Sequence, residues 1–163
     1  CTVYLHPADV PGGYRAESGR ARWAEGHIPG AGFADLQSDL SDQSASLRFM
    51  MPPAAQFAEA MSRYGVGGGV RVVLYDRFVN MWAARVWWMM RAFGFDGAAI
   101  LNGGWKKWTL EGRPVGSDDV RVDRLSGGDQ PGVVLAHAAS GPALQESTPP
   151  RLCHVQSLFR KPL

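Results

Sequence analysis

The hydrophobic positions of this chain predict a strand–helix–strand unit near its middle. A short apolar, β-branched run ends at Tyr75, and an apolar segment of helical length begins at Met81. Loops at the carboxyl ends of parallel strands form the usual ligand crevice, so we expect any chemistry in the loop after Tyr75. The expected elements are a strand at Val70–Tyr75, a loop at Asp76–Asn80, a helix at Met81–Phe93, a strand at Ala98–Leu101 and a helix at Trp105–Glu111.

The residues before this unit predict one further strand and one amphipathic helix. Thr2–Leu5 is a short strand candidate, whereas the many charges of Tyr14–Glu25 are typical of a solvated surface segment. Apolar residues recur at helical spacing in Ala54–Tyr64, and Gly65 is a natural stop, so this helix is expected to pack on a sheet.

The helix expected at Met81–Phe93 has apolar residues on nearly every face. Such a helix is typically buried on several sides. It contains Trp82, Trp87 and Trp88, for which core packing is the expected role in preference to stacking on a sugar or cofactor.

The length of 163 residues suits one well-buried domain, which we expect to comprise residues 1–115. Residues 116–163 are rich in Gly, Ser and Pro and lack periodicity, which predicts a linker or poorly ordered tail leading toward an absent second domain. Because the chain begins with Cys1 and has no apolar leader, we expect a fragment or processed piece.

The composition is that of a globular protein, with 45% hydrophobic and 20% charged residues. A net charge of +2 with scattered basic residues gives little reason to expect nucleic acid as a partner. No apolar run approaches the roughly 18 residues that a membrane span needs. We expect a soluble, cytoplasmic protein with no cofactor, no nucleic-acid partner and no membrane partner.

Two groups of polar residues outside the central unit could suggest a metal site. His27 lies in a tight turn, but no second ligand stands at metal spacing, so a structural role is expected. Asp35, Asp39 and Asp42 lie in a Ser-rich stretch that lacks the glycine and the final glutamate of a calcium loop. We interpret that stretch as a solvated loop and predict no metal site.

Two cysteines, Cys1 and Cys153, lie at opposite ends of the chain and suggest neither a disulfide framework nor a zinc site. Cys153 precedes His154, but no strand comes before it and no glycine-containing anion loop follows. Adjacent residues seldom face each other productively, so we expect no catalytic role for Cys153.

Several ordered motifs resemble those of the rhodanese-like family. The resemblance covers roughly Tyr14 to Val115. Within the family, the motifs resemble most specifically the amino-terminal domain of tandem-domain sulfurtransferases, the thiosulfate and 3-mercaptopyruvate enzymes. It implies an α/β fold, a three-layer domain with a central, mainly parallel sheet flanked by helices. The motifs are Gly26-His27-Ile28-Pro29-Gly30-Ala31, Val73-Leu74-Tyr75-Asp76, Ala83-Ala84-Arg85-Val86-Trp87-Trp88, Leu101-Asn102-Gly103-Gly104-Trp105 with Trp108, and Glu111-Gly112-Arg113-Pro114.

The resemblance also implies a chemistry that this chain lacks. In the family, a cysteine directly after the strand is held as a thiolate, takes sulfur from a donor as a persulfide and passes it to an acceptor. Here that position is Asp76, and a carboxylate cannot form a persulfide, so we expect the chain alone to be inactive and assign no catalytic residue. The pseudo-active-site loop consists of Asp76, Arg77, Phe78, Val79, Asn80 and Met81.

We hypothesise that Asp76 accepts charge-assisted hydrogen bonds from the loop amides and thereby holds the loop in shape. The expected function is the noncatalytic half of a sulfurtransferase whose partner, a catalytic second rhodanese domain, handles the small sulfur donor. The alternative is a free-standing, noncatalytic rhodanese-like binding module. A phosphatase of related fold is disfavoured, because its longer Cys- and Arg-bearing loop is absent.

Overall fold

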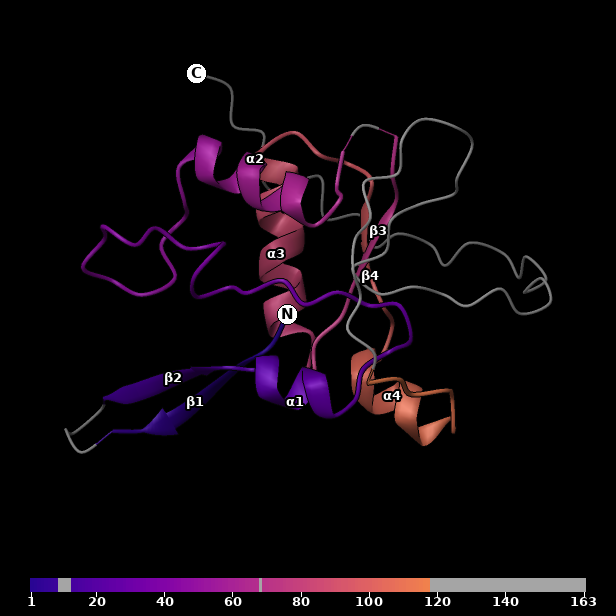
Figure 1. The fold of residues 1–163 in the computed structure, drawn as a ribbon. Coiled ribbons are helices and arrows are strands. Elements are labelled where there is room, and N and C mark those ends of the chain that lie inside the picture. Colours follow the sequence, from indigo (N-terminus) through magenta and orange to yellow (C-terminus); the bar gives the residue numbers. More distant parts are fainter. Residues whose placement is uncertain (9–12, 68, 118–163) are drawn as a thin grey trace, which may run out of the picture.

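The computed structural model describes residues 1–8, 13–67 and 69–117 (Figure 1). The hairpin β1–β2 extends to one side, and α2 and α3 lie together above α1 and α4. In chain order the elements are β1 (Val3–Pro7), β2 (Tyr14–Ser18), α1 (Arg20–Glu25), α2 (Ala54–Arg63), β3 (Val72–Leu74), α3 (Met81–Ala92), β4 (Ala98–Ile100) and α4 (Gly104–Leu110).

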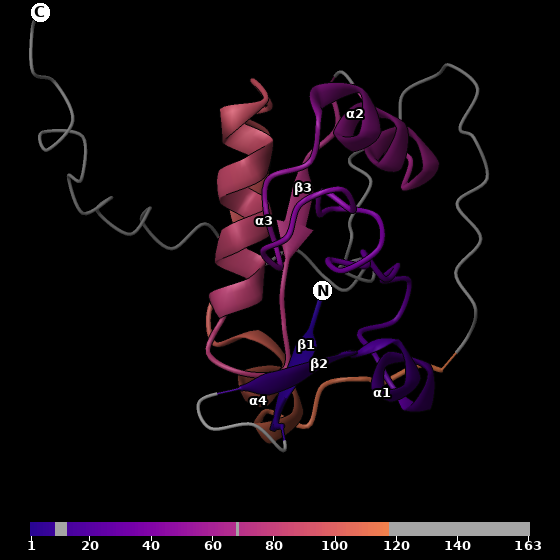
Figure 2. The ribbon, with the colours of Figure 1, turned by 90° about the vertical axis from the view of Figure 1, so that its left-hand side faces the viewer.

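The predicted strand–helix–strand unit is confirmed by β3, α3 and β4. The two strands pair in parallel, with Val72 opposite Ala98 and Leu74 opposite Ile100. The connecting helix α3 runs alongside β3 (Figures 1 and 2). Because parallel strands end at the same edge, the loop after Leu74 and the turn after Ile100 emerge next to each other.

The larger central sheet that the resemblance implies is not seen in the described residues, whose strands form two two-stranded sheets. The second sheet is the antiparallel hairpin of β1 and β2, with Val3 opposite Ser18 and Pro7 opposite Tyr14. Both β2 and α1 lie in the segment for which we predicted only a solvated surface. Neither β2 nor α1 contains a buried residue. Their sequences therefore lack the apolar periodicity by which a helix or strand is usually predicted.

One face of α2 and most of α3 share a hydrophobic core. Phe57 of α2 stacks on Phe93 with ring centroids 4.4 Å apart, and Met89 and Met90 of α3 are completely buried. Burying a side chain of this size contributes roughly 1.5–3 kcal/mol. The other buried members of this core are Val3, Ala34, Leu36, Leu40, Ala60, Met61, Val66, Val72, Leu74, Trp82, Ala83 and Val86.

The expectation that α3 is buried on several sides is wrong for one stripe of the helix. Met81 and Trp88 are 49% and 51% exposed, and Ala84 between them is exposed as well. Residues three and four apart share a helix face, so this stripe is continuous. The packing role predicted for the tryptophans holds for Trp82 and Trp87, whereas Trp88 lies outside the core.

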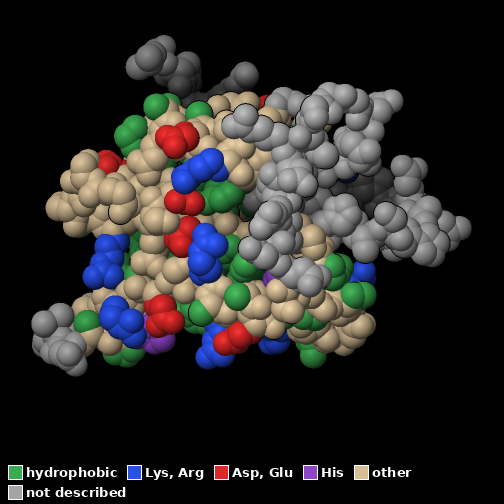
Figure 3. Space-filling model, in the orientation of Figure 1, with side chains coloured by type: hydrophobic (Ala, Val, Ile, Leu, Met, Phe, Trp, Pro, Cys, Tyr) green, Lys and Arg blue, Asp and Glu red, His purple; other side chains and the backbone are tan. Residues whose placement is uncertain are grey.

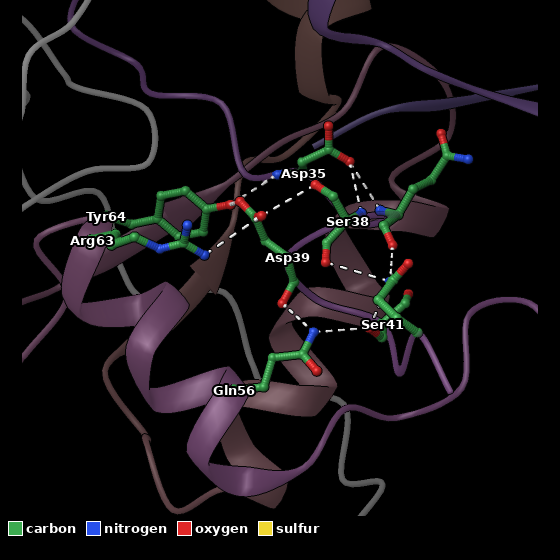
Figure 4. A network of polar contacts seen from close by, with 9 residues as sticks. Asp35, Ser38, Asp39, Ser41, Gln56, Arg63 and Tyr64 are labelled. Atoms are coloured by element: carbon green, nitrogen blue, oxygen red, sulfur yellow. Dashed lines mark hydrogen bonds and ion pairs between the residues drawn. The ribbon is translucent and has the colours of Figure 1, made fainter. Parts of the chain in front are cut away.

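Residues 26–53, which have no helix or regular strand, are fastened to the end of α2 by polar contacts (Figure 4). The Tyr64 hydroxyl accepts a hydrogen bond from the Asp35 N–H (3.0 Å) and donates one to the Asp39 carboxylate. The Asp35 carboxylate accepts from the Ser18 hydroxyl at 2.9 Å. The prediction of a solvated loop is therefore wrong for Asp35, which is only 8% exposed.

We expect this network to make the free energy of unfolding fall as the pH rises above about 10. Burial, together with the hydrogen bond to Asp39, raises the pKa of Tyr64 above its ordinary value of 10.0. The unfolded chain therefore releases the Tyr64 proton at lower pH than the folded chain does. The stabilisation that Tyr64 contributes is complete below pH 10.0, the ordinary pKa, and is lost progressively above it. Burial also raises the pKa of Tyr75, so Tyr75 adds to the same fall in the free energy of unfolding at alkaline pH.

Urea denaturation of the wild type and of Tyr64→Phe at a series of alkaline pH values measures this effect. The variant should lose about 1–3 kcal/mol near neutral pH and show a flatter decline with alkaline pH. Identical declines in the two proteins would remove Tyr64 from the explanation.

Acidic and basic side chains are interspersed on the described part of the face shown in Figure 3, so no patch of one sign forms there. None of the helices in the described part of the chain is long and apolar enough to cross a membrane. The predicted linker or tail at 116–163, including Cys153, lies outside the described residues except for Gly116 and Ser117.

Candidate functional site

The loop between β3 and α3 folds around the side chain of Asp76. Its Oδ1 atom accepts hydrogen bonds from the N–H groups of Phe78 (2.8 Å) and Asn80 (3.0 Å). Its Oδ2 atom accepts from the N–H groups of Trp82 (2.8 Å) and Ala83 (3.2 Å). Asp76 is completely buried, at 0% exposure. We call this carboxylate and its four amide donors the Asp76 cradle.

Two donors of the cradle belong to the first turn of α3. The first N–H groups of a helix have no acceptor within the helix, and they form the positive end of its dipole. Trp82 and Ala83 are therefore available to an anion, and Phe78 and Asn80 add two loop amides. Burying a carboxylate without partners is costly, and charge-assisted hydrogen bonds to both oxygens offset that cost.

Asn80 directs the chain from the loop into α3. It has a φ of 63°, in the left-handed region that Asn adopts more readily than most residues. Its side-chain amide donates to the carbonyl of Leu101 at 3.0 Å, and its own carbonyl accepts from the N–H of Ala84 at 2.8 Å. Asn80 thus links the cradle to the end of β4 and starts the helix.

The N-terminus of α4 packs directly against the back of the loop. Gly104 has a φ of 52°, and a Cβ atom there would lie 2.6 Å from Oδ1 of Asn80 and 3.0 Å from the carbonyl oxygen of Asp76. The Trp105 N–H donates to that same Asp76 carbonyl at 3.1 Å. Any side chain at position 104 would therefore be strained and would force Asn80 or the backbone at Asp76 to shift.

The basic side chain of the loop is directed away from the cradle. The Arg77 guanidinium donates to the carbonyls of Arg22 and Gly26, both at 2.5 Å, and lies 4.5 Å from the centre of the Trp105 ring. The Arg77 N–H donates to the Thr2 hydroxyl at 3.3 Å. Arg77 therefore fastens the loop to α1 and to the following turn.

Tyr75 ties the loop to that turn from inside. Its hydroxyl accepts a hydrogen bond from the Ile28 N–H at 3.2 Å, and its ring stacks near Trp105 with centroids 6.3 Å apart. Three of the motifs on which the resemblance rests therefore meet around the loop. Their apolar side chains form a second hydrophobic cluster, smaller than the main core. It consists of Ile28, Ala31 and Tyr75, with Leu101, Trp105 and Trp108 packed against it.

The six residues predicted for the pseudo-active-site loop have different environments. Asp76, Phe78 and Asn80 come together in the cradle through the carboxylate and the two backbone amides. Val79 and Met81 instead direct their side chains toward solvent, with exposed fractions of 85% and 49%.

Three residues of the site were not predicted from the sequence. Trp82 and Ala83 complete the cradle, and their position in the first turn of the expected helix was the signal that could have identified them. Gly104 packs against the loop, and the Asn-Gly-Gly turn was only a general indication of unusual backbone there.

His27 has a structural environment, as expected. Its Nδ1 atom lies 2.9 Å from the carbonyl oxygen of Trp23, and its ring stacks on that of Trp23 with centroids 4.3 Å apart. Its backbone exchanges two hydrogen bonds with Gly116. Within the described residues, no three His, Cys, Asp or Glu side chains lie close enough together to hold a metal ion.

Comparison with known proteins places the chain in a family. Residues 15–111 match the model of the family described as Rhodanese-like domain. The chain is 43% identical over 98 residues to thiosulfate sulfurtransferase of Gallus gallus, a match that covers 59% of this chain and 34% of the relative. It is 41% identical over 100 residues to 3-mercaptopyruvate sulfurtransferase of Homo sapiens, covering 60% and 33%.

A plant relative gives the same result. The chain is 44% identical over 91 residues to thiosulfate/3-mercaptopyruvate sulfurtransferase 2 of Arabidopsis thaliana, covering 56% of this chain and 26% of the relative. The chain thus spans about a quarter to a third of the length of these relatives. Because the family match covers more than half of its residues, the chain belongs to the rhodanese-like domain family.

Proposed function

We propose that this chain is the noncatalytic half of a sulfurtransferase that moves sulfane sulfur from thiosulfate or 3-mercaptopyruvate to a thiophilic acceptor. The observation that carries the proposal is the Asp76 cradle. Asp76, two residues after the end of β3, holds a carboxylate that is 0% exposed and hydrogen-bonded through both oxygens. The names of the relatives supply the donor class.

The chemistry of sulfur transfer supports this assignment. Sulfane sulfur is taken up by a soft, polarisable thiolate, which forms a sulfur–sulfur bond that a later acceptor can break. A carboxylate oxygen cannot hold sulfur in this way. The Asp76 oxygens are also fully engaged by four amides, so they offer no nucleophile to a donor.

The position of Arg77 adds to the same argument. Thiosulfate and 3-mercaptopyruvate are anions, and an anion site needs an available cation or unoccupied N–H groups. The Arg77 guanidinium is engaged by two carbonyls and an aromatic ring, and the amides of the cradle are engaged by Asp76. We therefore assign donor binding to a partner, a catalytic second rhodanese domain.

Sulfur transfer to cyanide, measured as thiocyanate with each donor, tests the proposal. The 163-residue chain should show no turnover, whereas the full-length product of its gene should transfer sulfur. Cys153→Ser is the control for an unexpected thiol in the chain alone. Robust turnover by the isolated chain that survives this substitution would contradict the role given to Asp76.

The same experiment separates the alternative function. A free-standing binding module would be inactive as the isolated chain and equally inactive as the full-length product. The cytoplasmic location remains a prediction from the sequence.

A further inference from the structure

Arg85 of α3 carries a positive charge that is partly buried and forms no ion pair within the described part of the chain. Its Nη2 group donates a hydrogen bond to the carbonyl of Phe49. Its Nε–H is buried and has no acceptor among the described residues. We propose that the Nε–Nη2 edge of Arg85 is a binding site for a small oxyanion, which displaces the Phe49 carbonyl. The site goes beyond the proposed function, because it concerns anion binding and a loop movement and not sulfur transfer.

The shape of the guanidinium explains the choice of ligand. Nε and Nη2 lie side by side, and together they present two parallel N–H donors that match two oxygens of one carboxylate, sulfate or similar anion. The Phe49 carbonyl is uncharged and engages only one of these donors. An oxyanion would engage both donors and add an opposite charge, so it is the stronger partner for this edge.

The surroundings of Arg85 also favour an incoming anion. Arginine stays protonated at neutral pH, so the charge is permanent. Removal of the guanidinium from water penalises its charged form and lowers the pKa of Arg85 below its ordinary value. A partly buried charge without an opposite charge is costly, and a bound anion would offset that cost.

The Phe49 carbonyl belongs to a loop with a strained residue. We call residues 42–50 the strap; its ends are joined by the hydrogen bond from the Asp42 N–H to the Met50 carbonyl at 3.0 Å. Phe49 has a φ of 60°, which is unfavourable for a residue with a bulky side chain. Its ring lies against that of Trp82 in the first turn of α3, with centroids 5.3 Å apart. Loss of the bond from Arg85 would let Phe49 leave this conformation.

Anion binding and closure of the strap therefore compete for Arg85. In the closed state the Phe49 carbonyl holds Nη2, and Nε is left without a partner. In the anion-bound state both donors are paired, the carbonyl turns to water and the strain at Phe49 is released. Because the anion binds only the open state, it shifts the population of the strap toward that state.

Hydrogen–deuterium exchange with peptide mass spectrometry tests the site in the 163-residue chain. Sodium sulfate should speed the exchange of residues 42–50 several-fold relative to sodium chloride at the same ionic strength, because the strap opens. As a solute, sulfate strengthens folded states and would slow exchange instead. The sign of the change therefore distinguishes binding from a general salt effect, and unchanged or slower exchange in sulfate overturns the inference.

Three variants assign the effect to the guanidinium. Arg85→Met removes it, so residues 42–50 should exchange rapidly in both salts. Arg91→Met is the matched control on the same helix, because Arg91 pairs with Asp96 at 3.2 Å and lies over the Trp87 ring, and it should respond to sulfate like the wild type.

Arg85→Lys keeps the charge without the two-donor edge, so the strap should stay closed and lose its response to sulfate. This variant decides the test if Arg85→Met does not melt like the wild type. A response to sulfate that survives Arg85→Lys contradicts the assignment.

Sodium acetate, compared with chloride in the same way, separates two sources of the same chemistry. Faster exchange of the strap with both anions supports a site for any anion with two oxygens, carboxylates included. Faster exchange with sulfate alone supports a site for sulfur oxyanions. Faster exchange with neither removes the site, and it leaves the proposed function standing, because sulfur transfer is measured separately as thiocyanate.

Discussion

Replacement of Asp76 with alanine should lower the free energy of unfolding by about 3–5 kcal/mol. The substitution leaves the N–H groups of Phe78, Asn80, Trp82 and Ala83 buried without their acceptor. Each orphaned donor costs on the order of 1–3 kcal/mol before the loop relaxes. Small domains are stable by only about 5–15 kcal/mol, so the loss should appear as a large drop in the urea midpoint.

Two further variants identify the cause of that loss. Asp76→Asn keeps the shape and one acceptor oxygen, so it should cost about 1–3 kcal/mol, less than alanine. Asp96→Ala removes a carboxylate whose side chain is 77% exposed and paired with Arg91, and it should change stability by less than about 1 kcal/mol. Equal costs for Asp76→Ala and Asp96→Ala would show that the cradle does not stabilise the loop.

Substitution of Gly104 with alanine should be nearly as severe, at about 3 kcal/mol or more. The new Cβ atom would meet Oδ1 of Asn80 at 2.6 Å and the carbonyl oxygen of Asp76 at 3.0 Å, and φ is 52°. To relieve this contact, the Asn80 side chain must move, which disturbs its hydrogen bond to the Leu101 carbonyl, or the backbone of the loop must shift. Urea denaturation of the variant measures the loss, and a free energy of unfolding within about 1 kcal/mol of the wild type would contradict the contact between Gly104 and the loop.

Gly112→Ala is the matched control for Gly104→Ala. Gly112 also has a positive φ, of 63°, but nothing lies within 4 Å of the position that its Cβ would take. Its substitution should cost only the backbone strain, about 1–2 kcal/mol. The difference between the two variants isolates the contact between α4 and the loop.

The elements of this fold with a buried face could be predicted from the sequence. The helix expected at Ala54–Tyr64 is α2 (Ala54–Arg63), and the one expected at Met81–Phe93 is α3 (Met81–Ala92). Apolar periodicity reports burial, so it found these helices and missed β2 and α1, whose residues are largely exposed. It also overestimated the burial of α3, because periodicity does not reveal whether a partner covers a given face.

The polar contacts could be predicted only where they are local. The bonds from Phe78 and Asn80 to Asp76 span two and four residues, and a strand–loop–helix pattern already suggests them. The bond from the Asp35 N–H to Tyr64 spans 29 residues, so no local pattern indicates that Asp35 is buried. The contact of Gly104 with Asn80 likewise depends on two segments that meet only in the folded chain.

The use of a carboxylate in the cradle has a consequence for chemical durability. A thiolate in such a position is open to peroxide, alkylating agents and soft metal ions, and each of these would change its charge or its size. The Asp76 carboxylate undergoes none of these reactions under ordinary conditions. The cradle therefore contains no group that changes between oxidising and reducing surroundings, and the hydrogen bonds that hold the loop should be the same in both.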